Sequence, residues 1–255
     1  MKVLIVGGNG SMGPRLVPAL QGRHELRVTD VNEPPPGFAH EYRQLDASDH
    51  DGVIAAAEGM DAIINLSVSR WDRRGAWDVN VRGNYNVAAA AVRHGIRTIV
   101  NTGPYYQVAG ASYDEFDFGL HPDMPPQPGT LLYALTKALG HEVLRVFSEQ
   151  HDLYVQTLLF YLMRHPTKPR RLDDHEKGGV GRDMIPPYIV AWPDTGLAIR
   201  AALEIDHARL PSRCETYFVF PTIPHGKYRN DKLARVLGWE PPHRLEHLWM
   251  RRMDR

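Results

Sequence analysis

The sequence predicts an α/β fold, a doubly wound parallel sheet with a small C-terminal lobe. Two observations predict it. Short aliphatic runs that suit buried strands alternate with helix-like segments through about residue 160, and the first run ends in a glycine-rich turn that leads into a helix. Right-handed crossovers would place the carboxyl end of every strand on one rim of the sheet. We therefore expect residues 1–160 to form the core and residues 161–255 a small lobe with elements that return to the core.

The N-terminal half alternates strands and helices. Its strands are expected at residues 3–6, 25–28, 42–45 and 61–66, and its helices at residues 14–21, 53–58 and 76–94. The strands are short runs of aliphatic and β-branched residues, among which 42–45 is the weakest. Pro14 suits the first turn of its helix, and the alanines of the third helix would permit close packing.

The C-terminal half continues this order less regularly. Strands are expected at residues 98–100, 155–161 and 217–220, and helices at residues 131–150, 194–203 and 231–237. Two segments show no regular period: residues 105–130 are rich in aromatic residues, acidic residues and proline, and residues 163–187 are basic. Loops this long in a compact domain are usually functional or disordered.

The turn after the first strand carries three glycines, Gly7, Gly10 and Gly13, at G-x-x-G-x-x-G spacing. A strand, a glycine turn and a helix in this order can place a diphosphate on free backbone N–H groups at the positive end of the helix dipole. One glycine would permit the tight turn, one would let the backbone approach the phosphates, and one would let the helix lie close to the strand. Ser11 and Met12, between the last two glycines, would line the same site.

Polar residues at the ends of later strands extend this site along the rim. Asp30 lies about 20 residues beyond the glycine turn, where a carboxylate can accept hydrogen bonds from the ribose hydroxyls of an adenosine. The same carboxylate would repel a 2′-phosphate, so NAD is favoured over NADP. Asp46 follows the weak third strand, and Ser67 lies just past the fourth, where it would border the cofactor.

Composition limits the partners of the chain. The 255 residues contain 30 Lys plus Arg and 30 Asp plus Glu, so no global charge recruits nucleic acid or an anionic membrane. No apolar run approaches the ~20 residues needed to cross a bilayer. Cys214 is the single cysteine, and the 13 histidines show no metal-ligand spacing with a third donor. We expect a cytoplasmic protein with a small-molecule substrate, no nucleic acid or membrane partner, and no metal.

The helix at residues 131–150 contains Tyr133 and Lys137, which an i, i+4 spacing places on one face. On its own this pair is more often structural than functional. A functional role is favoured here because other residues of a cofactor site precede the pair, namely the glycine turn, Asp30, Asp46, Asn80 and Thr102. In this order and approximate spacing, the set resembles the extended short-chain dehydrogenase/reductase family of Rossmann-fold enzymes, which includes nucleotide-sugar epimerases and dehydratases.

Two further motifs carry the resemblance. Asn80-Val81-Arg82-Gly83 is similar to the N-x-x-G helix motif of the family, and Leu237-Gly238-Trp239-Glu240-Pro241 is similar to its L-G-W-x-P ending. The resemblance implies that Tyr133 is the general acid or base, and that Lys137 lowers the pKa of the phenol and holds the nicotinamide ribose. It also implies that Thr102 orients the substrate oxygen and that Asn80 maintains the helix and a proton-relay water.

The substrate region departs from the family pattern. Phe160-Tyr161-Leu162-Met163-Arg164 stands where the family often has an arginine-proline and Tyr-Gly signature, and the chain is short for a nucleotide-sugar enzyme. In size and layout it is closer to the uronate dehydrogenases, compact members of the family that oxidise a free hexuronic acid. Arg164 and Arg182, in the basic segment, could bind a substrate carboxylate. Tyr105 could cover the substrate. The alternative for the arginines is a solvated basic loop without a ligand, and the alternative for Tyr105 is packing within the lobe.

Three hypotheses for function remain at this point. The first is an NAD-dependent oxidoreductase that acts on a secondary alcohol of a sugar or sugar acid. The second is a sugar or nucleotide-sugar epimerase or dehydratase that retains its NAD, and the third is a dinucleotide-binding sensor without catalysis. The family often dimerises through two long helices, here at residues 76–94 and 131–150, so a homodimer is a further expectation.

Overall fold

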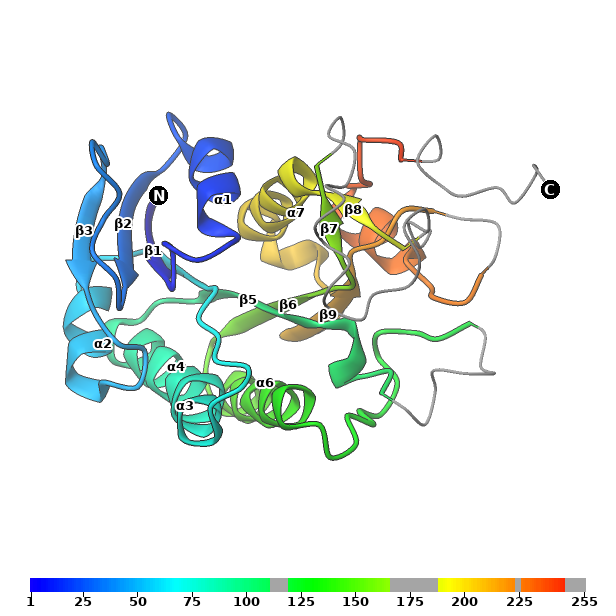
Figure 1. Cartoon of the computed structure of the whole chain (residues 1–255), viewed down its shortest axis with the longest axis horizontal. Helices are drawn as coiled ribbons and strands as arrows, with labels where there is room; N and C mark the ends of the chain where they lie inside the picture. The colour runs from blue at the N-terminus through cyan, green and yellow to red at the C-terminus, as the bar shows by residue number, and fades with distance from the viewer. Residues whose placement is uncertain (111–118, 166–187, 223–225, 246–255) are drawn as a thin grey trace, which may run out of the picture.

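The computed structural model describes residues 1–110, 119–165, 188–222 and 226–245. Its centre is a parallel sheet of seven strands in the order β3-β2-β1-β4-β5-β6-β9 (Figure 1). The strands are β1 (Lys2–Val6), β2 (Glu25–Asp30), β3 (Glu41–Gln44), β4 (Ala62–Asn65), β5 (Thr98–Pro104), β6 (Tyr154–Phe160) and β9 (Cys214–Phe218). The predicted doubly wound parallel sheet is confirmed.

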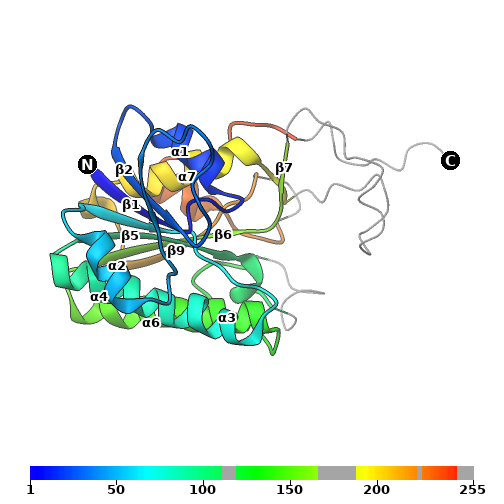
Figure 2. The same cartoon turned by 60° about the vertical axis from the view of Figure 1, so that its left-hand side comes forward.

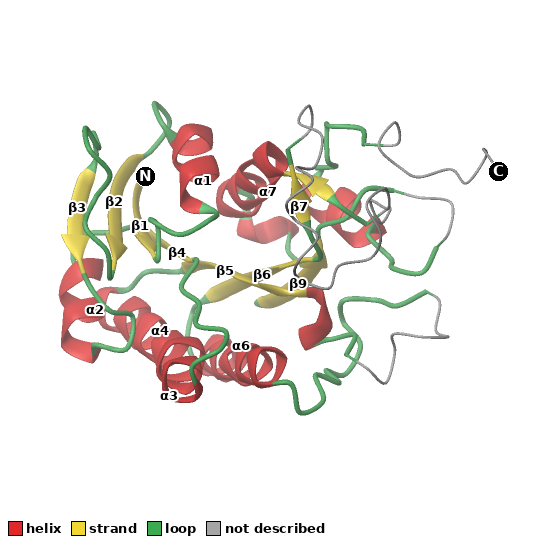
Figure 3. Cartoon of the chain, in the orientation of Figure 1, coloured by secondary structure: helices red, strands yellow, loops and turns green. Residues whose placement is uncertain are grey.

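Helices cover both faces of the sheet, as Figures 2 and 3 show. On one face lie α1 (Gly13–Leu20) and α7 (Trp192–Glu204). On the other lie α2 (His50–Ala57), α3 (Arg73–Trp77), α4 (Gly83–His94) and α6 (Leu132–Gln150). Short helical turns occur at η2 (Tyr105–Gln107), η4 (His207–Arg209) and η5 (Leu233–Leu237). None of the described helices combines the length and apolar character needed to cross a membrane.

Strand β1 shows why this sequence forms a buried central strand. Val3 and Ile5 belong to the apolar core under α1 and α7, whereas Leu4 and Val6 belong to the core under α2, α4 and α6. Successive side chains of a strand point to opposite faces, so only an unbroken apolar run can fill both cores. The glycine turn follows this strand directly, and the sheet therefore fixes its position.

Two features differ from the sequence prediction. The helix expected at residues 76–94 is divided into α3, a π-helical turn η1 (Asp78–Arg82) and α4. Gly140 of α6 lies against this turn so closely that a Cβ atom there would be 2.0 Å from the carbonyl oxygen of Asn80. The second difference is a small sheet, β7 (Met163–Arg164) with β8 (Val190–Ala191), which flanks the basic segment.

The C-terminal part of the chain returns to the core. Strand β9 pairs with β6, with Leu158 opposite Tyr217, and α7 packs against α1. Gly196 of α7 makes this contact close, since a Cβ atom there would be 2.3 Å from the carbonyl oxygen of Arg15. The helix that follows the glycine turn is thus held between the sheet and α7.

Candidate active site

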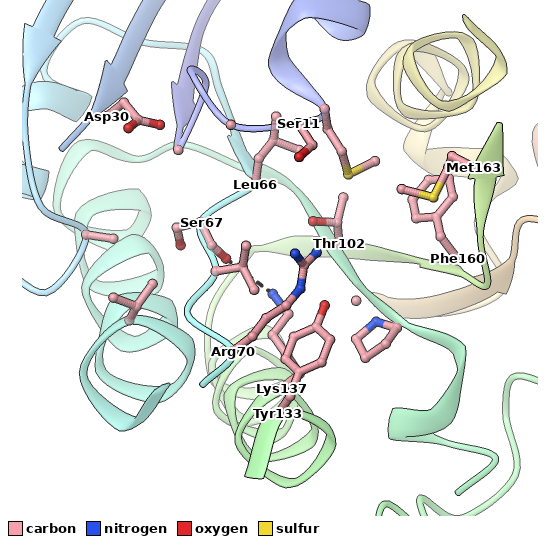
Figure 4. A pocket seen from close by; sticks show the side chains of 18 of the residues that line it. Ser11, Asp30, Leu66, Ser67, Arg70, Thr102, Tyr133, Lys137, Phe160 and Met163 are labelled. Carbon is pink, nitrogen blue, oxygen red and sulfur yellow. Dashed lines mark hydrogen bonds between the residues drawn. The ribbon is translucent and has the colours of Figure 1, made fainter. Parts of the chain in front are cut away.

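A cavity of about 720 Å³ opens at the carboxyl edge of the sheet, between α1 and α6 (Figure 4). Most of the residues predicted from the sequence line it. They are Gly7, Gly10, Ser11, Met12, Asp30, Asp46, Ser67, Thr102, Tyr133, Lys137 and Arg164. Its size is within the range of ordinary ligand sites. The topology thus brings together residues that are distant in sequence, although their individual roles stay predictions.

The glycine turn has the geometry that a phosphate cradle requires. Gly7 has a φ of +77°, and a Cβ atom on it would lie 2.7 Å from the backbone of Ser67. Gly13 does not line the cavity; a Cβ atom on it would lie 1.7 Å from the carbonyl oxygen of Gly8, so it serves the close approach of α1 to the turn. A Cβ atom on Gly10 would lie 3.5 Å from the carbonyl oxygen of Gly7, an ordinary contact distance. The backbone can therefore approach a diphosphate at this turn.

Asp30 is held in place at the end of β2. One carboxylate oxygen accepts hydrogen bonds from the backbone N–H and side-chain amide of Asn32, at 3.1 and 2.9 Å, and the other accepts from the N–H of Asn9 at 3.0 Å. Carboxylate oxygens have several acceptor positions, so ribose hydroxyls could still bind. Asp46, after β3, is the other carboxylate among the described residues that line the cavity, and this end has no lining lysine or arginine.

Ser67 lines the cavity in the loop that follows β4. Its hydroxyl and its backbone N–H donate to the side-chain oxygen of Asn65, at 2.7 and 3.1 Å. Its carbonyl oxygen accepts a long hydrogen bond of 3.4 Å from the Lys137 ammonium. The Asn65 amide is itself buried and donates to Asn84 of α4. A buried polar network therefore fixes the loop that follows β4.

Tyr133 and Lys137 reach the cavity from the first turns of α6, on one face as predicted. Tyr133 is half-buried, and burial raises the pKa of its phenol, an effect that the charge of Arg70 opposes. Lys137 is only 2% exposed. Burial, together with the charge of Arg70, lowers the pKa of its ammonium to about 8. Arg70 is thus a second cation beside the phenol, and the expected action of Lys137 on the pKa of Tyr133 stays a prediction.

Thr102 and Asn80 are both buried near this pair. Thr102 lines the cavity at the end of β5, and its hydroxyl donates to the carbonyl oxygen of Asn65 at 3.2 Å. A hydroxyl rotates about its C–O bond, so the same proton can be donated to a substrate oxygen instead. Asn80 does not line the cavity; its amide donates to the carbonyl oxygen of Ser69 at 2.7 Å and to the hydroxyl of Thr136 at 2.9 Å. Asn80 therefore ties the loop after β4 to α6.

The residues suggested for the substrate have different positions. Arg164, in β7, lines the cavity. Tyr105 is not among the lining residues and packs in an aromatic cluster with Tyr161, at 4.6 Å between ring centroids, and with Tyr228 at 5.5 Å. Its neighbour Tyr106 lines the cavity instead. Arg182 lies outside the described residues. Within the described residues, no group of three metal-binding side chains is arranged to hold a metal ion.

Several residues of the site are not among those predicted from the sequence, and three of them bear on its chemistry. Arg70 and Tyr106 line the cavity, and Asn65 organises the loop beneath it. Asn65 could have been noticed as the one polar residue near the end of an otherwise apolar strand. Arg70 and Tyr106 lie in irregular segments, where no periodic pattern indicates which side chains face inward.

Comparisons with known proteins agree with this geometry. An L-arabinose 1-dehydrogenase (NAD(P)(+)) of Haloferax volcanii is 26% identical over 199 residues, which are 69% of this chain and 72% of that protein. A uronate dehydrogenase of Pseudomonas syringae is 24% identical over 157 residues, 60% of this chain and 56% of that protein, so the match spans little more than half of its length.

A solved structure extends the likeness to the whole fold. The crystal structure of uronate dehydrogenase from Agrobacterium tumefaciens matches with a TM-score of 0.73 and 22% identity, over 96% of this chain and 86% of that one. The model of the NAD dependent epimerase/dehydratase family matches residues 3–171, which is more than half of the chain and contains the glycine turn and the Tyr133–Lys137 pair. The protein therefore belongs to the NAD dependent epimerase/dehydratase family.

Proposed function

We propose that this protein is an NAD-dependent dehydrogenase that oxidises a secondary alcohol of a free sugar or sugar acid. The observation that carries the proposal is one continuous cavity that joins the glycine turn and Asp30 to Thr102, Tyr133 and Lys137. A dinucleotide laid along it would have its adenosine ribose at Asp30, its diphosphate at the turn and its nicotinamide near Tyr133. The relatives that oxidise arabinose and uronates support the substrate class.

The mechanism follows from what each side chain can do. Bound NAD supplies the hydride acceptor. Thr102 would donate its hydroxyl proton to the substrate oxygen, in place of its 3.2 Å hydrogen bond to the Asn65 carbonyl oxygen, and so leave the substrate proton for Tyr133. The phenolate of Tyr133 would take the hydroxyl proton as the C–H bond breaks and the carbonyl forms. The Lys137 ammonium, buried one helical turn away, would donate to the nicotinamide ribose.

Asp30 supports NAD as the coenzyme. Its carboxylate is fixed at the adenosine end of the cavity, and no lysine or arginine among the described lining residues could neutralise a 2′-phosphate there. A negative charge beside a phosphate of the same sign is unfavourable. We therefore expect NAD to be preferred over NADP.

A substrate screen tests the proposal. The purified protein is incubated with NAD or NADP and with free sugars, uronic acids or nucleotide sugars, and both NADH absorbance and products are measured. A dehydrogenase forms NADH and a lactone or ketone in equal amounts. A redox-neutral product without net NADH would instead show an epimerase or dehydratase that retains its coenzyme. NAD binding with no turnover of any compound would contradict both.

A further inference from the structure

The loop between β4 and α3, residues 66–72, presents one side chain to the catalytic pair. The guanidinium carbon of Arg70 lies 5.3 Å from the centroid of the Tyr133 ring, within the range of a cation–π contact. Figure 4 shows the side chain of Arg70 extending from this loop toward Tyr133 and Thr102. Arg70 therefore lines the part of the cavity in which the substrate alcohol would react.

The charge of Arg70 has no carboxylate partner among the described residues. Other arginines of the protein have one, for example Arg27 with Glu41 at 2.8 Å and Arg97 with Asp152 at 2.7 Å. The carboxylates that line the same cavity, Asp30 and Asp46, lie at its adenosine end. Arg70 is thus a cation at the reacting end of the site, in contact with the ring of Tyr133.

Three groups face that phenol from three different elements. Arg70 comes from the loop after β4, Lys137 from the same helix one turn later, and Tyr106 from η2, with its ring centroid 5.7 Å from that of Tyr133. The ring of Tyr106 is neutral, and the ammonium of Lys137 donates a 3.4 Å hydrogen bond to the carbonyl oxygen of Ser67. Arg70 is the charge that opposes the effect of burial on the pKa of Tyr133.

The loop that carries Arg70 is fixed next to it. The buried side chain of Asn80 donates to the carbonyl oxygen of Ser69 and accepts from the backbone N–H of Ser69, at 2.7 and 3.1 Å. One amide thus holds the residue that immediately precedes Arg70 at both of its backbone groups. The backbone next to Arg70 is therefore held by a buried side chain, and this fixes the point from which the guanidinium extends toward Tyr133.

We propose that Arg70 is a positioning residue for proton transfer, which stabilises the phenolate form of Tyr133 that accepts the hydroxyl proton of the substrate. The inference rests on the proposed function. In the step it serves, the O–H and C–H bonds of the alcohol break, the carbonyl forms, the proton goes to the Tyr133 oxygen and the hydride to the nicotinamide. After the step, Tyr133 is a neutral phenol, and the attraction to Arg70 is released.

The first test is the pH dependence of kcat/KM for alcohol oxidation in the wild type, Arg70→Gln and Arg70→Lys. An opposite charge at this distance lowers a pKa by about 1 to 3 units, and the exposure of Arg70 places the effect at the lower end. We expect Arg70→Gln to move the rising limb of the profile up by about one pH unit, and Arg70→Lys to restore most of the shift. Arg74→Gln removes an exposed charge of α3 that faces Asp78, and it should leave the limb in place.

A second test needs no substrate, so it separates this inference from the proposed function. Ultraviolet titration of tyrosinate in the wild type, minus the same titration of Tyr133→Phe, isolates one phenol among the 11 tyrosines. The isolated titration should shift to higher pH in the Arg70→Gln background. An unchanged titration, or a loss of kcat/KM that is equal at every pH, would overturn the role of Arg70. A protein that shows the shift but oxidises nothing would overturn only the proposed function.

Discussion

Two lysines are buried among the residues that the structure describes, and we expect the same substitution to have opposite effects on the stability of the protein at these two positions. Lys137 is 2% exposed and Lys232 is 3% exposed. Lys232 forms ion pairs with Asp123 and Glu215, each at 2.5 Å. Lys137 has no carboxylate partner among the described residues and donates only a 3.4 Å hydrogen bond to a carbonyl oxygen. Changing each lysine to methionine therefore compares the effect on stability of removing a paired buried charge with that of removing an unpaired one.

The magnitude for Lys137 follows from its pKa. Burial lowers that pKa from 10.5 to about 8 in the folded protein, a difference that corresponds to about 3 kcal/mol. Because the folded pKa is below the unfolded one, the unfolded state binds more protons between pH 8 and 10.5, and wild-type stability rises with pH across this window. The cost of burying the charged Lys137 ammonium is present in full below pH 8 and disappears above pH 10.5.

Urea unfolding without coenzyme measures the effect. We expect Lys137→Met to raise the free energy of unfolding at pH 7 by about 2 kcal/mol, after subtracting about 1 kcal/mol for the lost hydrogen bond. The difference in the free energy of unfolding between Lys137→Met and the wild type should shrink as the pH approaches 10. Lys232→Met should instead lower the free energy of unfolding by about 3 kcal/mol, because it leaves Glu215 buried and unpaired. A Lys137→Met protein that is less stable than the wild type at pH 7 would refute this reasoning.

Two further predictions concern the coenzyme and the assembly. Asp30→Asn keeps an acceptor oxygen but removes the charge, so the ratio of kcat/KM with NADP to that with NAD should rise by about tenfold or more; an unchanged ratio would show that Asp30 does not select the coenzyme. Tyr85, Leu139 and Val146 are exposed on α4 and α6, with fractions of 48%, 37% and 44%, and we propose that they form the contact of a homodimer. Light scattering should find a dimer for the wild type and a monomer for Leu139→Glu/Val146→Glu, and a monomeric wild type would refute the proposal.

The sequence could predict those elements whose signal is local. Strand β1 was expected at residues 3–6 and spans Lys2–Val6, and the long helix expected at 131–150 spans Leu132–Gln150. Buried parallel strands consist of unbroken apolar runs, and long helices show a sustained period, so each can be recognised without knowledge of its neighbours. The order of these elements then fixes which loops meet at the carboxyl edge.

Features that depend on distant contacts could not be predicted in this way. The π-helical turn η1 interrupts a helical period where Gly140 of α6 approaches Asn80, and nothing in residues 76–94 indicates that approach. The strands of the β7–β8 sheet are two residues long and 26 positions apart, which is too short for a pattern. Arg70 lies in a loop without periodicity, and its importance appears only because α6 brings Tyr133 beside it.

In the proposed NAD-dependent oxidation, the proton of the substrate hydroxyl passes to Tyr133. The most direct test of this step is a single-turnover measurement of NADH formation by the wild type and by Tyr133→Phe, with the substrate found in the screen and with NAD affinity measured in parallel. We expect Tyr133→Phe to bind NAD as the wild type does but to form NADH at least about 100-fold more slowly. Equal rates of NADH formation in the two proteins would contradict it.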